Sequence, residues 1–196
     1  MIRQFLQAGA QVTACDRRPR EQLDGRAQEL EELGARLCLG NGYLEDLDAE
    51  LVLRTPGMKP YLPQLEAARR RGVNVTSEME LFFELCPAPI YGVTGSDGKT
   101  TTTTILAGLL TAAGKKVHLG GNIGRALLPV IADIRPEDAA VVELFSFQLT
   151  GMRQSPHVAV VTNVAPNHLD WHTDMAEYVE AKRNLVAYQQ SGDRAV

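Results

Sequence analysis

The chain has 196 residues, of which 44% are hydrophobic and 22% are charged. These values are ordinary for a globular α/β protein of one or two domains. The net charge of -4 argues against a nucleic-acid-binding surface, so we interpret the basic run Arg69-Arg70-Arg71 as the solvent-facing side of a helix.

Cysteine usage and hydropathy favour a cytoplasmic location. Cys15, Cys38 and Cys86 are odd in number and far apart, as expected for reduced thiols. The first residues, MIRQFLQAGAQ, lack the apolar core of a signal peptide. No apolar run approaches the roughly 20 residues that span a bilayer. We therefore expect a cytoplasmic protein that is not inserted into a membrane.

Short apolar runs alternate with helical patterns through the first half of the chain. The patterns predict helices over residues 2–8, 21–33 and 62–71, and strands over residues 12–15, 37–39, 51–53 and 73–75. Such alternation indicates a parallel sheet, because parallel strands need crossover connections. A doubly wound sheet normally begins with a strand and a glycine-rich turn, whereas this chain begins with a predicted helix. We therefore expect the first strand of this domain to be missing.

A capped helix and two prolines predict a domain boundary. Ser77 and Glu80 form a capping-box pattern that begins a helix, and Cys86-Pro87-Ala88-Pro89 ends it. We therefore assign residues 1–86 to one domain and residues 87–196 to the next. The second domain has predicted strands over residues 90–93, 116–119, 140–143 and 158–161, and a final helix over residues 175–189.

The segment IYGVTGSDGKTTTTT, residues 90–104, joins a strand to a helix through a glycine-rich loop. Glycines let successive backbone N–H groups turn toward an anion, and the next helix adds its positive dipole end. Lys99 supplies a mobile cation, and the Thr100 hydroxyl suits Mg²⁺. Val93 stands where the strict P-loop pattern has glycine, so a simple strand-to-helix turn is the alternative. The predicted phosphate site comprises Thr94, Gly95, Ser96, Asp97, Gly98, Lys99, Thr100 and Thr101.

Two acidic residues lie at the ends of predicted strands. Glu143 follows a run of apolar residues, at the edge where open α/β sheets bind ligands, and its carboxylate suits Mg²⁺. A solvated glutamate is the alternative. Asp16 stands where a dinucleotide-binding fold places the acid that holds a ribose, but the glycine fingerprint of an NAD site is absent.

His168 and His172 are four residues apart in the segment NHLDWH. Such a pair could bind zinc on a helix, but the surrounding Pro and Asn favour a loop and no third N or S ligand is nearby. The residues alone therefore favour a hydrogen-bonding role for His168. Lys182 lies in a predicted amphipathic helix, where a lysine is ordinarily a solvated charge.

Six segments in order resemble the Mur ligases, the ATP-dependent amide-forming enzymes of bacterial cell-wall synthesis. They are TPGMKPYLP, SEMELFF, GVTGSDGKTTTTT, GGNIG, VVELFSFQL and NVAPNHLDWH, continuing to Glu180-Ala181-Lys182. The resemblance covers essentially the whole chain. It implies a Rossmann-like parallel-sheet domain followed by an incomplete, P-loop-type central ATP-binding domain. It also implies that a C-terminal ligase domain is absent, so that this chain alone would be inactive.

The resemblance assigns roles around the phosphate loop. It implies that Thr100 and Glu143 hold one Mg²⁺ beside the phosphates of ATP. His168 matches a ligand to a second Mg²⁺, and Lys182 matches a lysine that carries CO₂ as a carbamate near that ion. An unmodified lysine would be repelled by two metal ions, and the carbamate removes this conflict. Lys99, Glu143, His168 and Lys182 are then the expected catalytic residues.

The family member that the segments match joins D-glutamate to UDP-N-acetylmuramoyl-L-alanine through an acyl phosphate. We expect this reaction of the parent protein, as a monomer. Another Mur ligase, a folylpolyglutamate synthetase and a nucleotide-binding fragment without turnover are the alternatives. The resemblance implies a substrate site in which Asp16 and Arg17 bind uracil, Thr55 and Gly57 bind the diphosphate, and Asn122, Ser146 and His168 bind the sugar-peptide end.

One position departs from the family pattern. Where the family usually has Glu-Leu-Ser-Ser-Phe-Gln-Leu, this chain has ELFSFQL from Glu143 to Leu149. Phe145 thus replaces a small hydroxyl that would face the muramoyl substrate. We expect that replacing this donor and acceptor with a bulky apolar group near a polar ligand costs about one to three kcal/mol, unless Ser146 partly compensates.

Overall fold

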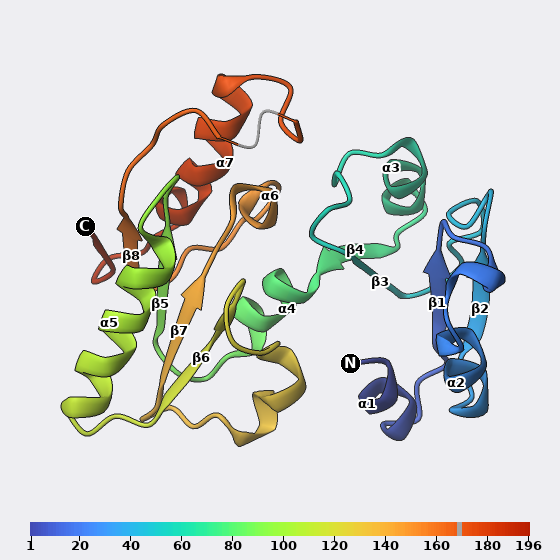
Figure 1. The fold of residues 1–196 in the computed structure, drawn as a ribbon, viewed down its shortest axis with the longest axis horizontal. Coiled ribbons are helices and arrows are strands. Elements are labelled where there is room, and N and C mark those ends of the chain that lie inside the picture. The colour runs from blue at the N-terminus through green and yellow to red at the C-terminus, as the bar shows by residue number, and fades with distance from the viewer. Residues whose placement is uncertain (168–169) are drawn as a thin grey trace. The chain divides into compact units, whose positions relative to one another are not determined.

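The computed structural model describes residues 1–167 and 170–196 (Figure 1). The chain divides into two compact units. The first contains Met1–Val52 and Tyr61–Val75, and the second contains Leu53–Pro60 and Thr76–Val196. The predicted division at residues 86 and 87 stays a prediction.

The first unit is built on the parallel pair of strands β1, Thr13–Asp16, and β2, Arg36–Leu39. Between them lie a 3₁₀ turn, η1 at Arg20–Gln22, and helix α2, Arg26–Glu32. Helix α1, Ile2–Gln7, precedes β1, and helix α3, Pro63–Arg70, follows strand β3, Leu51–Arg54. Strand β3 pairs with β4, Asn74–Ser77, and both strands run from the first unit into the second.

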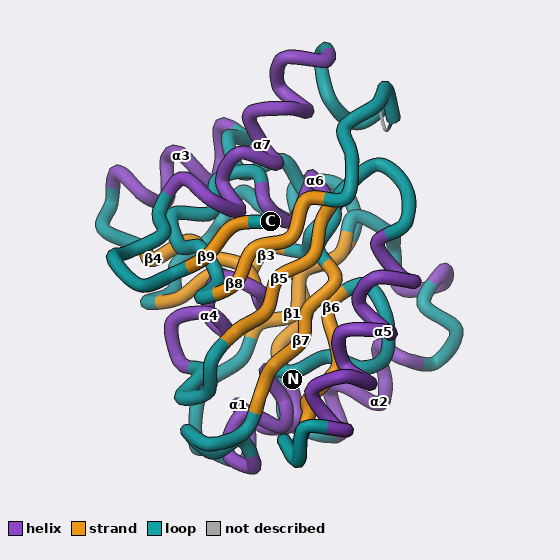
Figure 2. The backbone as a smooth tube through the Cα atoms, turned by 90° about the vertical axis from the view of Figure 1, so that its left-hand side faces the viewer, coloured by secondary structure: helices purple, strands orange, loops and turns teal. Residues whose placement is uncertain are grey.

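The second unit contains a five-stranded sheet in the order β6-β7-β5-β8-β9, with every neighbouring pair parallel. Its strands are β5 Ile90–Thr94, β6 Val117–Gly121, β7 Ala139–Glu143, β8 Val158–Val161 and β9 Arg194–Ala195. Figure 2 shows β6, β7, β5 and β8 side by side. This order places β5 at the centre, so the loop after β5 lies between the ends of β7 and β8. The expected α/β fold with parallel sheets is confirmed.

Helices α4, Glu78–Leu85, α5, Lys99–Ala112, and α7, Met175–Ala187, pack in the second unit with the short helix α6, Ser146–Leu149, and the 3₁₀ segment η2, Leu128–Asp133. Strand β7 is buried at all five positions, as expected of a parallel strand covered on both faces. The apolar core includes Phe82 of α4, Leu185 of α7 and Val142 of β7. Among the described residues, every helix is too short or too polar to span a bilayer.

Two local predictions are corrected. The helix expected over residues 21–33 begins only at Arg26, because Asp24 and Gly25 both have positive φ, 44° and 77°, which ends a right-handed helix. Only half of the capping box forms. Ser77 Oγ accepts a hydrogen bond from Glu80 N at 3.2 Å, but the Glu80 carboxylate lies 3.4 Å from Arg54.

Candidate active site

The loop after β5 needs glycine at two positions. Gly98 has φ of 76° and directly precedes α5. A Cβ atom at Gly95 would lie 1.8 Å from Thr162 Oγ1, so no side chain fits there. The loop therefore approaches the segment after β8 closely.

Residues after β8 hold the loop through its backbone. Asn163 Oδ1 accepts hydrogen bonds from Ser96 N and Asp97 N, each at 2.9 Å. Thr162 Oγ1 donates to the carbonyl oxygen of Asp97 at 2.5 Å. Thr162 and Asn163 are not among the residues predicted for this site, although both directly follow a predicted strand next to the loop. Polar residues at that place were the available signal.

Ser96 fixes the loop from its other side. Its hydroxyl is within 2.8 Å of Tyr178 Oη on α7, donates to Ala165 O at 2.7 Å and accepts from Ala165 N at 2.8 Å. Thr94 and Ser96 are buried, whereas Asp97, Thr100 and Thr101 are exposed. The start of the loop is thus held by hydrogen bonds to its neighbours, and the part of the loop from Asp97 onward includes residues exposed to solvent.

Lys99 is bound to the loop itself. Its Nζ atom donates hydrogen bonds to Gly95 O at 2.9 Å and Ser96 O at 2.8 Å, and lies 5.1 Å from the centroid of the Phe145 ring. Only 8% of Lys99 is exposed. To bind a phosphate, Lys99 must exchange these carbonyl oxygens for phosphate oxygens. Phe145, the residue that differs from the usual family sequence, therefore contacts the lysine of the phosphate loop.

Glu143 joins the phosphate loop to the segment after β6. Glu143 is 1% exposed, and its carboxylate accepts hydrogen bonds of 2.8 Å from Thr100 Oγ1 and from Asn122 Nδ2. The backbone of Asn122 also donates to Glu143 O at 3.0 Å. Oxygen donors from a carboxylate and a hydroxyl are those that Mg²⁺ prefers.

Lys182 is buried beside the same loop. Its Nζ atom donates to Thr94 Oγ1 at 3.2 Å and lies 4.7 Å from the centroid of the Tyr178 ring. Burial, and secondarily the charge of Lys99, lowers the pKa of Lys182 to about 8. The neutral amine of Lys182 is therefore accessible near physiological pH.

Ser146 begins helix α6 and is buried. Its hydroxyl lies 2.8 Å from His172 Nε2, and His172 Nδ1 lies 3.8 Å from Glu177 Oε2. The ring of His172 meets that of Tyr178 edge-on, with centroids 5.4 Å apart. His168 lies outside the described residues. Among the described residues, no group of three His, Cys, Asp or Glu side chains could hold a metal ion.

The other predicted substrate residues lie in both units. Asp16 ends β1 in the first unit, where hydrogen bonds from Arg18 lower the pKa of Asp16 to about 2. Arg17 is exposed next to it. Thr55 and Gly57 belong to the second unit and are exposed. The second unit thus brings together the phosphate loop, Glu143, Asn122 and Lys182.

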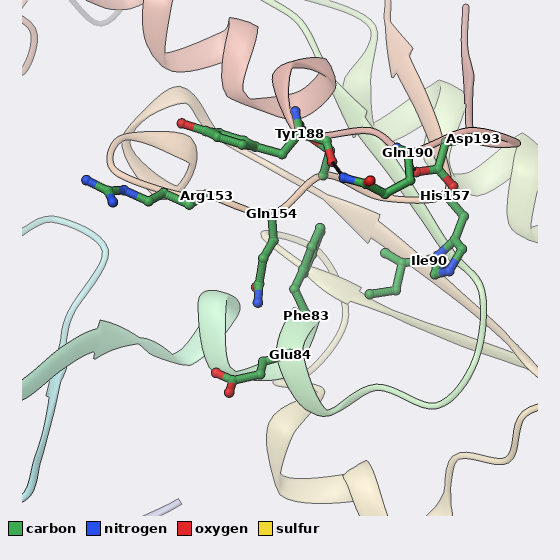
Figure 3. A pocket seen from close by; sticks show the side chains of 10 residues that line it. Phe83, Glu84, Ile90, Arg153, Gln154, His157, Tyr188, Gln190 and Asp193 are labelled. Atoms are coloured by element: carbon green, nitrogen blue, oxygen red, sulfur yellow. Dashed lines mark hydrogen bonds between the residues drawn. The ribbon is translucent and has the colours of Figure 1, made fainter.

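A separate cavity of about 470 Å³ lies in the second unit (Figure 3). Its lining includes Ile90 at the start of β5 and His157 just before β8, joined by a 3.0 Å hydrogen bond from Ile90 N to His157 Nδ1. The phosphate loop follows the opposite end of β5. None of the predicted site residues lines this cavity.

Comparison with known proteins identifies the family. The model of the Mur ligase middle domain matches residues 93–196, more than half of the chain. The chain belongs to the Mur ligase family. This Mur ligase chain is 52% identical over 194 residues to the UDP-N-acetylmuramoylalanine--D-glutamate ligase of Symbiobacterium thermophilum, and 49% identical over 197 residues to that of Acetivibrio thermocellus. The aligned segments cover 98% and 100% of the chain, respectively.

The chain spans only 43% and 42% of the lengths of these two relatives. A solved structure with a similar fold is the UDP-N-acetylmuramate:L-alanyl-gamma-D-glutamyl-meso-diaminopimelate ligase from Neisseria meningitides. It matches with a TM-score of 0.57 at 22% identity, over 97% of this chain and 64% of that one. This likeness supports the Mur ligase fold alone.

Proposed function

We propose that the protein containing this chain is a cytoplasmic ATP-dependent ligase that joins D-glutamate to UDP-N-acetylmuramoyl-L-alanine. One observation carries the chemistry: the buried Glu143 carboxylate accepts hydrogen bonds from Thr100 of the phosphate loop and from Asn122. A group bound to the loop and a substrate near Asn122 would therefore meet at one carboxylate. The names of relatives at about half identity support D-glutamate over the substrates of other Mur ligases and of folylpolyglutamate synthetase.

The reaction is a phosphoryl transfer followed by an acyl transfer. A carboxylate oxygen of UDP-N-acetylmuramoyl-L-alanine attacks the γ-phosphorus of ATP, and ADP leaves. The amine of D-glutamate then attacks the acyl carbon, phosphate leaves and the nitrogen loses a proton. Lys99 would neutralise charge on the transferring phosphoryl group, while the loop from Thr94 to Thr101 holds the nucleotide.

Thr100 and Glu143 fit a Mg²⁺ ion, because they present hydroxyl and carboxylate oxygens beside the phosphate loop. Mg²⁺ would neutralise phosphate charge and orient the γ-phosphoryl group. For a second ion we propose His168 and Lys182 as ligands. Asp16 and Arg17 at uracil, Thr55 and Gly57 at the diphosphate, and Asn122, Ser146 and His168 at the sugar-peptide end complete the proposed site.

We propose that Lys182 carries CO₂ as a carbamate. Carbamate formation needs a neutral amine, whose nitrogen bonds to the carbon of CO₂ and releases one proton. The lowered pKa of Lys182 supports this chemistry. The test is ¹³C NMR of the full-length protein in ¹³C-bicarbonate, with the Lys182→Ala variant as the control. A carbamate signal that Lys182→Ala lacks is expected, and the same signal in both proteins would refute the assignment.

The reaction is tested on the full-length protein by measuring ADP release and amide product. We expect both to require ATP, Mg²⁺, UDP-N-acetylmuramoyl-L-alanine and D-glutamate. L-Glutamate, L-lysine and meso-diaminopimelate serve as competing amines, and a tetrahydrofolate serves as a competing acid. Faster turnover with any of these would overturn the proposed specificity. ATP binding without any amide product would favour a nucleotide-binding protein instead.

A further inference from the structure

Arg54 is buried directly next to the exposed loop that contains Thr55 and Gly57. It ends strand β3 and is only 3% exposed. A buried guanidinium requires hydrogen-bond acceptors, because an unpaired buried charge is strongly unfavourable. Its partners therefore show which segments it holds together.

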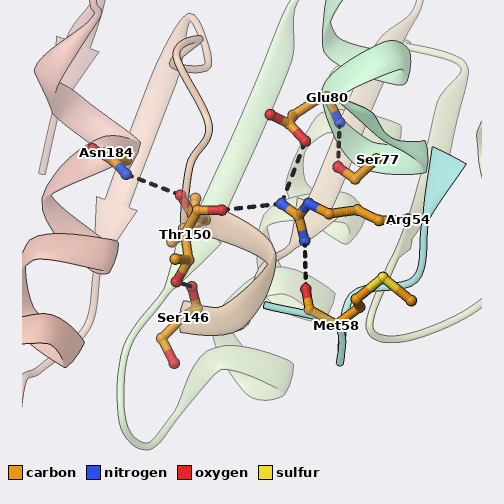
Figure 4. Close-up of polar contacts among 8 residues, drawn as sticks. Arg54, Met58, Ser77, Glu80, Ser146, Thr150 and Asn184 are labelled. Atoms are coloured by element: carbon orange, nitrogen blue, oxygen red, sulfur yellow. Dashed lines mark hydrogen bonds and ion pairs between the residues drawn. The ribbon is translucent and has the colours of Figure 1, made fainter. Parts of the chain in front are cut away.

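Among the residues that the structure describes, Arg54 donates hydrogen bonds to acceptors in three different segments (Figure 4). It reaches Met58 O at 3.3 Å in its own loop and Glu80 Oε2 at 3.4 Å on α4. It also reaches Thr150 O at 3.0 Å, at the end of α6. The planar guanidinium can serve these acceptors together, whereas a lysine ammonium is a single point charge.

The contact with Thr150 leads to the proposed substrate residue Ser146. Thr150 Oγ1 donates a hydrogen bond to Ser146 O at 3.1 Å, within one turn of α6. Asn184 of α7 donates to Leu149 O at 3.0 Å and fixes the same turn (Figure 4). Arg54 therefore connects the loop of Thr55 and Gly57 to the helix that begins at Ser146.

Trp171 ties the same loop independently. Its Nε1 atom donates a hydrogen bond to Gly57 O at 3.0 Å, and Lys59 Nζ lies 5.4 Å from the centroid of its ring. The centroids of the Trp171 ring and of the Phe147 ring on α6 are 6.1 Å apart. Two separate side chains thus connect this loop with α6.

We propose that Arg54 is a positioning residue for the UDP-linked substrate, holding the loop of Thr55 and Gly57 in a fixed relation to Ser146. This inference rests on the proposed function, in which the loop binds the diphosphate and Ser146 binds the sugar-peptide end. One ligand bound at both places binds more tightly when the two segments are already arranged. Arg54 acts through its partners, because its own side chain is buried.

The test uses the full-length protein and its Arg54→Lys, Arg54→Met and Trp171→Phe variants. We expect Arg54→Met to raise the KM for UDP-N-acetylmuramoyl-L-alanine about tenfold, with a smaller rise for Arg54→Lys. Trp171→Phe keeps a ring but loses the bond to Gly57, so it should raise the same KM. The KM for ATP should change by less than about twofold. Arg183→Lys, an exposed change on α7, is the matched control.

An unchanged KM for the UDP-linked substrate in Arg54→Lys and Trp171→Phe would overturn the inference. Equal increases in both KM values would also overturn it, because they would indicate general damage to the fold. If Arg54→Met does not fold, the other two variants decide. A wild-type protein without turnover would overturn the proposed function. Calorimetric binding of UDP-N-acetylmuramoyl-L-alanine would then decide the role of Arg54 separately, with weaker binding expected in the variants.

Discussion

Thr100 donates a 2.8 Å hydrogen bond from its hydroxyl to Glu143 Oε2, which joins the first turn of α5 to the end of β7. The other carboxylate oxygen accepts from Asn122 at the same distance. Because Glu143 is 1% exposed, its charge is stabilised mainly by these protein partners. A metal ion beside Thr100 would compensate that charge directly.

Glu143→Gln tests this arrangement in the full-length protein. The variant keeps the shape but removes the negative charge, so a higher Mg²⁺ concentration should be needed for half-maximal activity. Turnover at saturating Mg²⁺ should fall about a hundredfold. Steady-state rates in a Mg²⁺ titration measure both effects. The exposed Glu137→Gln is the control, and an unchanged Mg²⁺ dependence in Glu143→Gln would contradict a role in metal binding.

Lys99→Ala should abolish productive ATP binding, because it removes the cation expected to meet the β- and γ-phosphates. Calorimetry with ATP and Mg²⁺ measures the affinity, and circular dichroism checks the fold. Lys115→Ala, which removes an exposed lysine, should bind ATP normally. Normal affinity and turnover in Lys99→Ala would refute the phosphate-loop assignment.

Phe145→Leu should strengthen ATP binding about two- to fivefold. The Phe145 ring lies against Lys99 while this lysine is bound to the carbonyls of its own loop. A cation–π contact is worth about 0.5–1 kcal/mol, and losing it should release Lys99 more easily for phosphate. Fluorescence titration with a labelled ATP analogue measures the change. Weaker binding would mean that the ring supports the nucleotide-bound state instead.

Lys182 should make stability depend on pH. Below pH 8 both folded and unfolded states hold the proton, so the unfavourable burial of charge is fully present. Between pH 8 and the usual value of 10.5, the folded state has lost the proton while the unfolded state keeps it. The free energy of unfolding should therefore rise with pH in this window, relative to Lys182→Met.

Urea denaturation of the full-length protein in CO₂-free buffer, at several pH values between 7.5 and 10.5, measures this difference. The buffer must lack CO₂ because a carbamate would change the titrating group. Parallel curves for the wild type and Lys182→Met would show that the pKa of Lys182 is not lowered in the folded protein.

The sequence predicted the strands of the second unit well, because β5, β7 and β8 are nearly continuous apolar runs that only a buried parallel sheet accommodates. Strand β9 was missed, since Arg194–Ala195 is too short and polar to leave a periodic signal. The late start of α2 was missed because Asp24 takes a positive φ that its residue type only weakly predicts.

The site residues that lie at or just after the ends of predicted parallel strands could be predicted from the sequence. Glu143 ends β7, and Lys99 begins α5 after the loop that follows β5, so the ends of parallel strands located both residues. Lys182 contacts Thr94 Oγ1 and Arg54 contacts Thr150 O, and each of these partners lies far away in the sequence. Local patterns carry no signal for such contacts. The roles assigned to these residues stay predictions.

The most direct test of the proposed chemistry follows oxygen atoms. The full-length protein is given UDP-N-acetylmuramoyl-L-alanine labelled with ¹⁸O in its terminal carboxylate, together with ATP, Mg²⁺ and D-glutamate. If the carboxylate is phosphorylated before the amine attacks, each phosphate released carries one ¹⁸O atom from the carboxylate. Mass spectrometry of the phosphate should find this label at the level of the substrate. Amide product accompanied by unlabelled phosphate would contradict the acyl-phosphate route.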